Sequence, residues 1–265
     1  MTRLISIAAG VTPELFAEPE RFIDAAATAG WPGTGIWFDP DTWDRARTRT
    51  VADRIAATGL TAVDMEVIRI GADGDCGEQL IDAAAEVGAR NVLTISSLPD
   101  ADATAERLGE LCRHAAPAGI RVCIEFMRFT AVKTLADAVD VAERTGEANV
   151  GILCDLLHVV RSGTTFDDIA AADAGLFPYV QWCDAPAEPR GWTTRDLVGD
   201  ALDDRSAPGE GDLRADAFEA LFSPSVPFSL EVRSAALREE FPDAVERAEH
   251  LLKRTRAALD RTSRH

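Results

Sequence analysis

Short apolar runs alternate along this chain with longer stretches in which apolar residues recur every three or four positions. The short runs are rich in β-branched residues and predict buried strands, whereas the longer spacing is that of a helix with one apolar face. Glycine follows several helical stretches, for example at Gly88 and Gly146, where helices commonly end. The predicted strands are Leu4–Ala9, Gly35–Phe38, Ala62–Ile68, Asn91–Ser96, Arg121–Met127, Val150–Leu156, Tyr179–Cys183 and Pro227–Val232. The predicted helices include Pro19–Ala29, Asp75–Val87, Ala101–Ala118, Thr134–Thr145 and Leu237–Leu259.

Eight strand–helix units fit into the 265 residues. Strands that alternate with helices pair in parallel, and eight such units close most simply into a (β/α)8 barrel. The alternative, an open doubly wound sheet, normally carries a glycine-rich phosphate-binding turn after its first strand. Here that turn reads AAGVTP from Ala8 to Pro13 and lacks the G-x-G-x-x-G pattern. We therefore predict an α/β protein that forms one TIM-barrel domain over residues 1–265.

One connection is much longer than the others. About 30 residues between Cys183 and Ala215 are rich in proline, glycine, arginine and aspartate. Loops of this length are uncommon unless they are functional or disordered. In a barrel this segment emerges at the C-terminal face, where active sites are built.

Three acidic residues lie inside apolar strands: Glu125 in VCIEFM, Asp155 in GILCDLL and Glu231 in FSLEV. Each is near the C-terminal end of its predicted strand. Burying an unpaired carboxylate costs several kcal/mol of free energy, so three of them at strand ends indicate that they belong to one functional site. A closed barrel brings strands five, six and eight to one mouth, and Gln181 in YVQWCD completes the ring from strand seven.

Carboxylate and amide oxygens are ligands that hard cations prefer, so this ring predicts a site for Mn²⁺ or Mg²⁺. Co²⁺ is also compatible, and Zn²⁺ is less favoured. A cation would explain why mutually repelling acids lie together. The alternative is that the acids form ion pairs with arginines nearby, namely Arg69, Arg128 and Arg233. The predicted metal ligands are Glu125, Asp155, Gln181 and Glu231.

His158 follows Asp155 by three residues, where the chain leaves a strand end. We interpret it as a substrate-binding or acid–base residue, because imidazole titrates near neutral pH. Arginines near the strand ends are candidates to bind substrate carboxylates or hydroxyls, with a surface role as the alternative for each. Glu66 in DMEV is a candidate partner for one of these arginines. The predicted catalytic residues are Glu125, Glu231 and His158, and the predicted substrate-binding residues are His158, Arg69, Arg190, Arg233 and Trp182.

Composition narrows the class of partner. The chain has 45 acidic and 27 basic residues and a net charge of −18, which argues against a nucleic-acid-binding face. No apolar run approaches the length of a membrane span, and the N-terminal apolar stretch is too short for a signal peptide. The five cysteines are odd in number and contain no C-x-x-C pair, as expected in a reducing compartment. We expect a cytoplasmic protein that acts on a small molecule.

The strand-end residues make the chain resemble the sugar phosphate isomerase/epimerase superfamily, the xylose-isomerase-like TIM barrels. The resemblance is carried by Glu125 in CIEF, by Asp155 and His158 in CDLLH, and by Glu231 in SLEV. The segment PGEGD from Pro208 also resembles the family pattern. The resemblance implies a divalent metal held by these acids and a His that contacts the substrate. It is also compatible with a homo-oligomer, either a dimer or a tetramer.

Gln181 departs from the epimerases, which usually carry His at this position. The dehydroshikimate dehydratase branch can carry Gln in a VQ-x-x-DAP context, and this chain reads VQWCDAP from Val180 to Pro186. The local resemblance therefore includes dehydroshikimate dehydratases, together with inosose dehydratases and ketose 3-epimerases.

The resemblance implies removal of a proton α to a carbonyl, with the enediolate held by the metal. In an epimerase, Glu125 and Glu231 would act on opposite faces of the substrate. In a dehydratase, one base removes the proton and a β-hydroxyl leaves with help from an acid such as His158. Two alternatives are a non-catalytic or assembly subunit on a decayed barrel, which Gln181 would favour, and an AP-endonuclease-like phosphodiesterase, which the acidic composition and four histidines disfavour.

Overall fold

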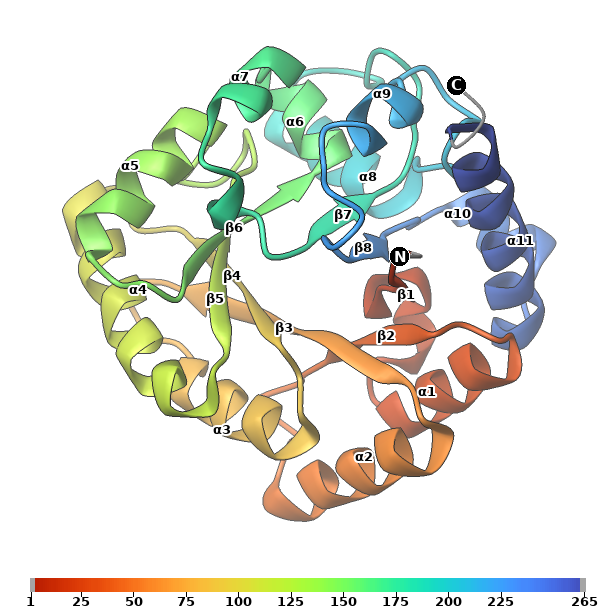
Figure 1. Ribbon diagram of the computed structural model, residues 1–265, viewed down its shortest axis with the longest axis horizontal. Coiled ribbons are helices and arrows are strands. Elements are labelled where there is room, and N and C mark those ends of the chain that lie inside the picture. The colour runs from red at the N-terminus through yellow and green to blue at the C-terminus, as the bar shows by residue number, and fades with distance from the viewer. Residues whose placement is uncertain (1–2, 263–265) are drawn as a thin grey trace.

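The computed structural model describes residues 3–262, and its eight strands form a closed parallel barrel. Each strand pairs with the next one along the chain, and β8 pairs with β1. Figure 1 shows the strands in the centre of the molecule and the helices around them. The predicted (β/α)8 fold is therefore confirmed. The strands are β1 (Ile5–Ile7), β2 (Gly33–Trp37), β3 (Thr61–Ile70), β4 (Asn91–Ser96), β5 (Arg121–Glu125), β6 (Val150–Asp155), β7 (Val180–Trp182) and β8 (Phe228–Leu230).

Helices cover the outside of the barrel, and two sequence predictions about them are wrong. The predicted helix Leu237–Leu259 is split in two around Pro242, which lacks an N–H to donate within a helix. The long segment after β7 was predicted to be a loop, but it contains a helix. The first turn of this helix is capped by Thr193 and Asp196 in a reciprocal capping box. No helix within residues 3–262 combines the length and apolarity needed to cross a bilayer. The α-helices are α1 (Pro19–Thr28), α2 (Arg45–Thr58), α3 (Gly77–Val87), α4 (Ala101–Ala115), α5 (Leu135–Thr145), α6 (Leu156–Ser162), α7 (Phe166–Ala171), α8 (Thr194–Asp203), α9 (Ala215–Glu219), α10 (Ala235–Glu240) and α11 (Ala244–Thr262).

Alternate residues of each strand face the helices and the barrel interior. On β8, Phe228 and Leu230 belong to the main core, so Ser229 between them faces inward. The interior holds a second, smaller apolar cluster. Some of its members precede a predicted site residue by two positions, so this cluster lies one layer below the polar side chains at the strand ends and supports them. The buried members of the cluster are Val63, Leu93, Cys123, Leu153 and Tyr179.

Candidate active site

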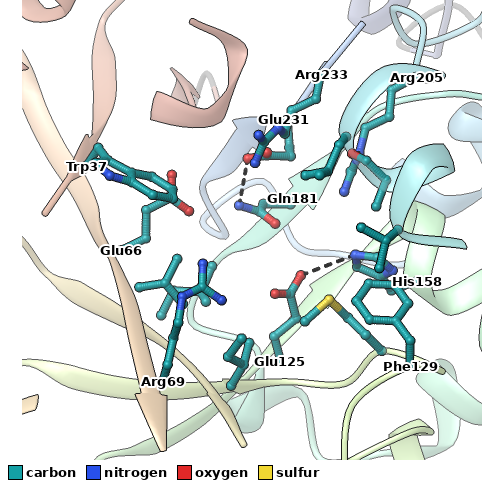
Figure 2. Close-up of a pocket in the computed structure, with 17 residues that line it drawn as sticks. Trp37, Glu66, Arg69, Glu125, Phe129, His158, Gln181, Arg205, Glu231 and Arg233 are labelled. Atoms are coloured by element: carbon teal, nitrogen blue, oxygen red, sulfur yellow. Dashed lines mark hydrogen bonds and ion pairs between the residues drawn. The ribbon is translucent and has the colours of Figure 1, made fainter. Parts of the chain in front are cut away.

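A cavity of about 310 Å³ opens at the C-terminal ends of the barrel strands. Figure 2 shows acidic and basic side chains that point into it from several strands. Its volume is at the lower end of the range for small-molecule sites, so it suits a small metabolite. The lining residues are Trp37, Glu66, Val67, Arg69, Leu93, Ile95, Glu125, Met127, Phe129, His158, Gln181, Val198, Ala201, Leu202, Arg205, Glu231 and Arg233.

Three of the four predicted metal ligands line this cavity. Glu125 ends β5, Gln181 lies in β7, and Glu231 follows β8 directly. Gln181 Nε2 donates a hydrogen bond to Glu231 Oε2 at 3.1 Å (Figure 2). A Cβ atom at position 10 would lie 2.4 Å from Glu231 Oε1, so Gly10 leaves the space that this carboxylate occupies. The fold thus brings strand-end side chains that are far apart in the sequence to one mouth.

Asp155, the fourth predicted ligand, is fully buried beside the cavity. Its Oδ1 accepts hydrogen bonds from the backbone N–H groups of Leu157 at 2.7 Å and His158 at 3.3 Å, and so caps α6. Its Oδ2 accepts a hydrogen bond from Arg205 Nη1 at 2.6 Å. Both carboxylate oxygens of Asp155 are therefore held in fixed directions.

Arg205 is a site residue that the sequence pattern did not reveal. Its buried side chain lines the cavity, although it lies 50 residues from Asp155 in the sequence. The only sequence signal is its position three residues before Pro208, at the start of the PGEG segment. As the alternative to a metal site, the sequence analysis predicted ion pairs between the strand-end acids and arginines near them in the sequence. Within residues 3–262 those arginines, Arg69, Arg128 and Arg233, form no ion pair with these acids, and Arg205 alone does so.

His158 lies in the first turn of α6, with its Nε2 3.8 Å from Glu125 Oε1 (Figure 2). Phe129 packs edge-on against the ring, with centroids 5.7 Å apart. Burial lowers the pKa of His158 to about 4, because a buried imidazolium is poorly solvated. The ring is therefore neutral at pH 7. Ligand atoms of Glu125, Asp155 and His158 lie within 4.8 Å of one another, so His158 is also placed as a potential metal ligand.

β3 contributes two further buried acids, Asp64 and Glu66. Burial raises the pKa of Asp64 to about 7, and the nearby charge of Glu231 adds to this shift. Burial also raises the pKa of Glu66 well above its ordinary value. The sequence pattern identified Glu66 only as a partner for an arginine and did not identify Asp64, because alternating acids on a strand equally fit a solvated face.

The acids in and below the cavity outnumber the arginines that line it. When all are ionised, five carboxylates face three guanidinium groups, which leaves an excess of two negative charges. A divalent cation matches this excess, and three carboxylates and an amide supply the oxygen donors that such a cation prefers. The residues present therefore fit a divalent metal. The carboxylates are Asp64, Glu66, Glu125, Asp155 and Glu231, and the arginines are Arg69, Arg205 and Arg233.

Two predicted substrate-binding residues lie away from the cavity. The Arg190 side chain is 83% exposed and pairs with Asp204 at 2.6 Å. Trp182 packs among the helices, where its Nε1 donates to the backbone oxygen of Ala215 at 3.0 Å. Side chains alternate along a strand, so the inward direction of Gln181 turns its neighbour Trp182 outward. The structure therefore places neither Arg190 nor Trp182 where it could contact a substrate in this cavity, whereas Arg69 and Arg233 do line it.

α8 supplies an apolar wall of the cavity. A buried ion pair fixes this helix to α6: Arg161 Nε lies 2.7 Å from Asp200 Oδ2, and both side chains are 3% exposed. The ends of the segment that carries α8 also meet, because Asp184 and Ser206 form an antiparallel bridge. The wall is thus held in place at its middle and at its ends. The wall residues are Val198, Ala201 and Leu202.

Comparison with known proteins finds relatives of one kind. The sequence profile described as xylose isomerase-like TIM barrel matches residues 23–257. A 3-dehydroshikimate dehydratase from Pseudomonas aeruginosa is 28% identical over 271 residues, covering 93% of this chain and 42% of that protein. An inosose isomerase from Halalkalibacterium halodurans is 29% identical over 111 residues, covering 41% of this chain and 37% of that protein. The matched region thus spans less than half the length of either relative.

A solved structure shows the same fold. The IOLI protein, crystallised with a zinc atom bound, superposes on this chain with a TM-score of 0.80. The two chains are 17% identical, and the superposition covers 97% of this chain and 98% of that one.

Proposed function

Because the chain belongs to the xylose isomerase-like TIM barrel family, we propose that it is a divalent-metal-dependent enzyme of the dehydratase or isomerase kind. Its substrate is a small polyhydroxylated ketone, and its reaction begins with removal of a proton α to the carbonyl. We favour dehydration, because the similarity to a dehydratase covers 93% of the chain and the similarity to an isomerase covers 41%. The observation that carries the proposal is the convergence on one cavity of strand-end carboxylates that, when ionised, outnumber the arginines lining it.

Glu125, Asp155, Gln181 and Glu231 would hold the metal. When bound, the metal would polarise the substrate carbonyl and offset the negative charge that develops on its oxygen. Oxygen donors favour Mn²⁺ or Mg²⁺, with Co²⁺ also compatible. The neutral ring of His158, close to two of these carboxylates, adds a nitrogen donor that would also suit Zn²⁺.

The protein groups have separate roles in dehydration. Glu231 accepts the α-proton, and the hydrogen bond from Gln181 holds its carboxylate in one direction. The N–H of the neutral His158 ring donates a hydrogen bond to the departing hydroxyl. The hydroxyl and the proton taken by Glu231 leave together as water, so the products are an unsaturated ketone and water.

Epimerisation or isomerisation is the second candidate. Glu125 and Glu231 enter the cavity from β5 and β8, on different sides of its centre (Figure 2). Two carboxylates so arranged could remove a proton from one face of a substrate and return it to the other. Incorporation of deuterium from D₂O into recovered substrate, without loss of water, would identify this outcome.

A phosphodiesterase of the AP-endonuclease kind has less support from the site. Within residues 3–262, His158 is the only histidine that lines the cavity. His114 pairs with Asp82 at 2.8 Å, and His250 packs against Phe241. Metal analysis of the purified protein tests the remaining alternative, because a folded chain that binds no divalent ion would indicate a non-catalytic subunit.

Glu231→Gln is the sharpest test of the mechanism, since it removes the base and keeps the side-chain shape. We expect turnover of 3-dehydroshikimate, followed by the ultraviolet absorbance of the aromatic ring that forms when the unsaturated ketone enolises, to fall by about 10²–10⁴-fold. Glu239→Gln, at an exposed position, is the control and should retain full activity. Unchanged turnover in Glu231→Gln, with normal circular dichroism, would contradict the proposed role.

A further inference from the structure

Glu66 is a cavity residue that has no role in the mechanism proposed above. It lies on β3 beside Trp37 of β2, and its backbone oxygen accepts a hydrogen bond from the N–H of Phe38 at 2.8 Å. Figure 2 shows its carboxyl group at the side of the cavity away from His158. The sheet therefore fixes Glu66 at a place that a bound molecule can reach.

The carboxyl group of Glu66 also lacks a partner within the protein. The residue is 4% exposed, and its Oε1 is buried with no hydrogen-bond donor among residues 3–262. The charge of Arg233 lowers the pKa of Glu66, yet no ion pair joins these two side chains in the described part of the chain. The large majority of buried polar side-chain atoms have a partner, and a buried polar atom without one costs stability.

An acid that destabilises the fold and makes no contact within it is expected to serve a ligand, because activity is often gained at the expense of stability. Trp37, next to Glu66, gives this side of the cavity a flat wall. The ring of Trp37 is fixed by parallel stacking on Phe16, with centroids 3.7 Å apart. Glu66 is thus a polar group at the edge of an otherwise apolar and rigid surface.

The surroundings of Glu66 favour a neutral ligand group that both donates and accepts hydrogen bonds. Burial raises the pKa of Glu66 well above its usual range, and the charges of Glu231 and Asp64 add to this shift. These neighbouring acids also disfavour an anion at the same place. A protonated carboxyl group donates one hydrogen bond and accepts others, and a hydroxyl group matches both functions.

We propose that Glu66 hydrogen-bonds to a hydroxyl group of the substrate that takes no part in the reaction, and that it thereby determines which hydroxyketones bind. This rests on the proposed function, in which His158 faces the departing hydroxyl. Because Glu66 lies on the side away from His158, the hydroxyl that it binds is a further one (Figure 2). 3-Dehydroshikimate has hydroxyl groups only on the two reacting carbons, so a more hydroxylated ketone should bind more tightly.

The test compares catechol with two ligands that each add one hydroxyl group to it, pyrogallol and 1,2,4-trihydroxybenzene. All three are flat and neutral and offer the metal the same adjacent pair of oxygens, so the third hydroxyl is the difference between them. Calorimetry on the Mn²⁺-loaded protein, in the absence of oxygen, measures each Kd. We expect at least one trihydroxy ligand to bind the wild type about 10-fold more tightly than catechol.

Glu66→Leu should bind all three ligands alike. Glu66→Gln should keep part of the preference, because its amide group also donates and accepts hydrogen bonds. The control, Glu239→Leu, alters an exposed acid and should bind as the wild type does. Since Glu66→Leu removes an unpartnered buried acid, the metal-free variant should also unfold at a higher urea concentration than the wild type at pH 8.

Three results would overturn this inference and leave the proposed function intact. They are equal affinity of the wild type for the three ligands, a preference that persists in Glu66→Leu, and a lower urea midpoint in Glu66→Leu, which would mean that the carboxyl group serves the fold. If the Mn²⁺-loaded wild type bound none of the ligands, the proposed function would fail and the inference with it.

Discussion

Asp64 is a single side chain whose protonation affects the stability of the whole barrel. It is fully buried on β3, and its pKa is raised to about 7 by burial and by Glu231. In the unfolded chain the same group loses its proton near its ordinary pKa of 3.8. Between these two values the folded state holds a proton that the unfolded state has lost. The free energy of unfolding therefore falls as pH rises from about 4 to about 7, and this contribution stays lost at higher pH.

Asp64→Asn should remove this pH dependence, because an amide has the same shape and no charge. We expect the metal-free variant to be more stable than the wild type at pH 8 by about 2–4 kcal/mol, since each pKa unit corresponds to about 1.4 kcal/mol. The two proteins should differ little at pH 4. Urea denaturation at both pH values measures this, and a variant that is less stable than the wild type at pH 8 would refute it.

The residues of the candidate site differ in whether the sequence alone could identify them. Glu125 and Glu231 could be identified because an acid inside an apolar strand is anomalous without any knowledge of its neighbours. Arg205 could not, because its role depends on a contact with Asp155 across 50 residues. Trp182 was predicted to contact the substrate, but it is the neighbour of Gln181 on β7 and its side chain faces outward. In a strand of three residues, the sequence does not determine which side chains face the barrel interior.

At the scale of elements, α8 depends on the buried ion pair between Arg161 and Asp200. Asp200→Ala leaves the Arg161 guanidinium buried without its carboxylate, which costs about 3–5 kcal/mol. We expect the segment from Asp184 to Ser206 to be cleaved faster in limited proteolysis, and KM to rise more than kcat falls because a cavity wall is loosened. Mass spectrometry of the fragments locates the cuts.

Arg195→Ala is the matched control for α8, since this residue is exposed on the same helix. It should leave both the proteolysis pattern and KM unchanged. A proteolysis pattern of Asp200→Ala identical to that of the control would show that the ion pair does not hold the wall.

The errors in predicting elements have local physical causes. α8 lies in a stretch rich in proline, glycine and aspartate, and its signal was the capping pair of Thr193 and Asp196 rather than a long apolar repeat. The helix predicted over Leu237–Leu259 was drawn through Pro242, although proline interrupts the hydrogen bonding of a helix interior.

At the scale of the whole molecule, the barrel could be predicted because the strand–helix pattern recurs along the sequence. Eight alternations of strand and helix, with glycines at helix ends, suffice to indicate a closed barrel, and closure then brings the strand-end acids together. What this repetition does not contain is the position of the charges that balance those acids, because Arg205 and the α8 wall belong to an irregular segment.

Metal binding should couple to the stability of the whole barrel and to pH. Burial raises the pKa of Glu125 and Glu231, so protons compete with the metal for these carboxylates at low pH. Mn²⁺ at about 100 times its Kd should stabilise the fold by about 2.7 kcal/mol. At a fixed Mn²⁺ concentration, we expect the rise in Tm over an EDTA-treated sample to be larger at pH 8 than at pH 5.

Glu231→Gln should lose most of that rise, and Glu239→Gln should keep it. Differential scanning calorimetry of the wild type and the two variants, each with Mn²⁺ and with EDTA, measures these shifts in Tm. A rise in Tm that is the same at both pH values would mean that the metal stabilises the protein at a place other than these acids.

The bridge between Asp184 and Ser206 has a consequence for how proteins of this family can diversify. Because Asp184 and Ser206 are joined at the barrel rim, insertions, deletions or replacements in the chain between them need not displace β7 or β8. The strand-end residues can then be inherited unchanged while a different segment between Asp184 and Ser206 forms the wall of the cavity.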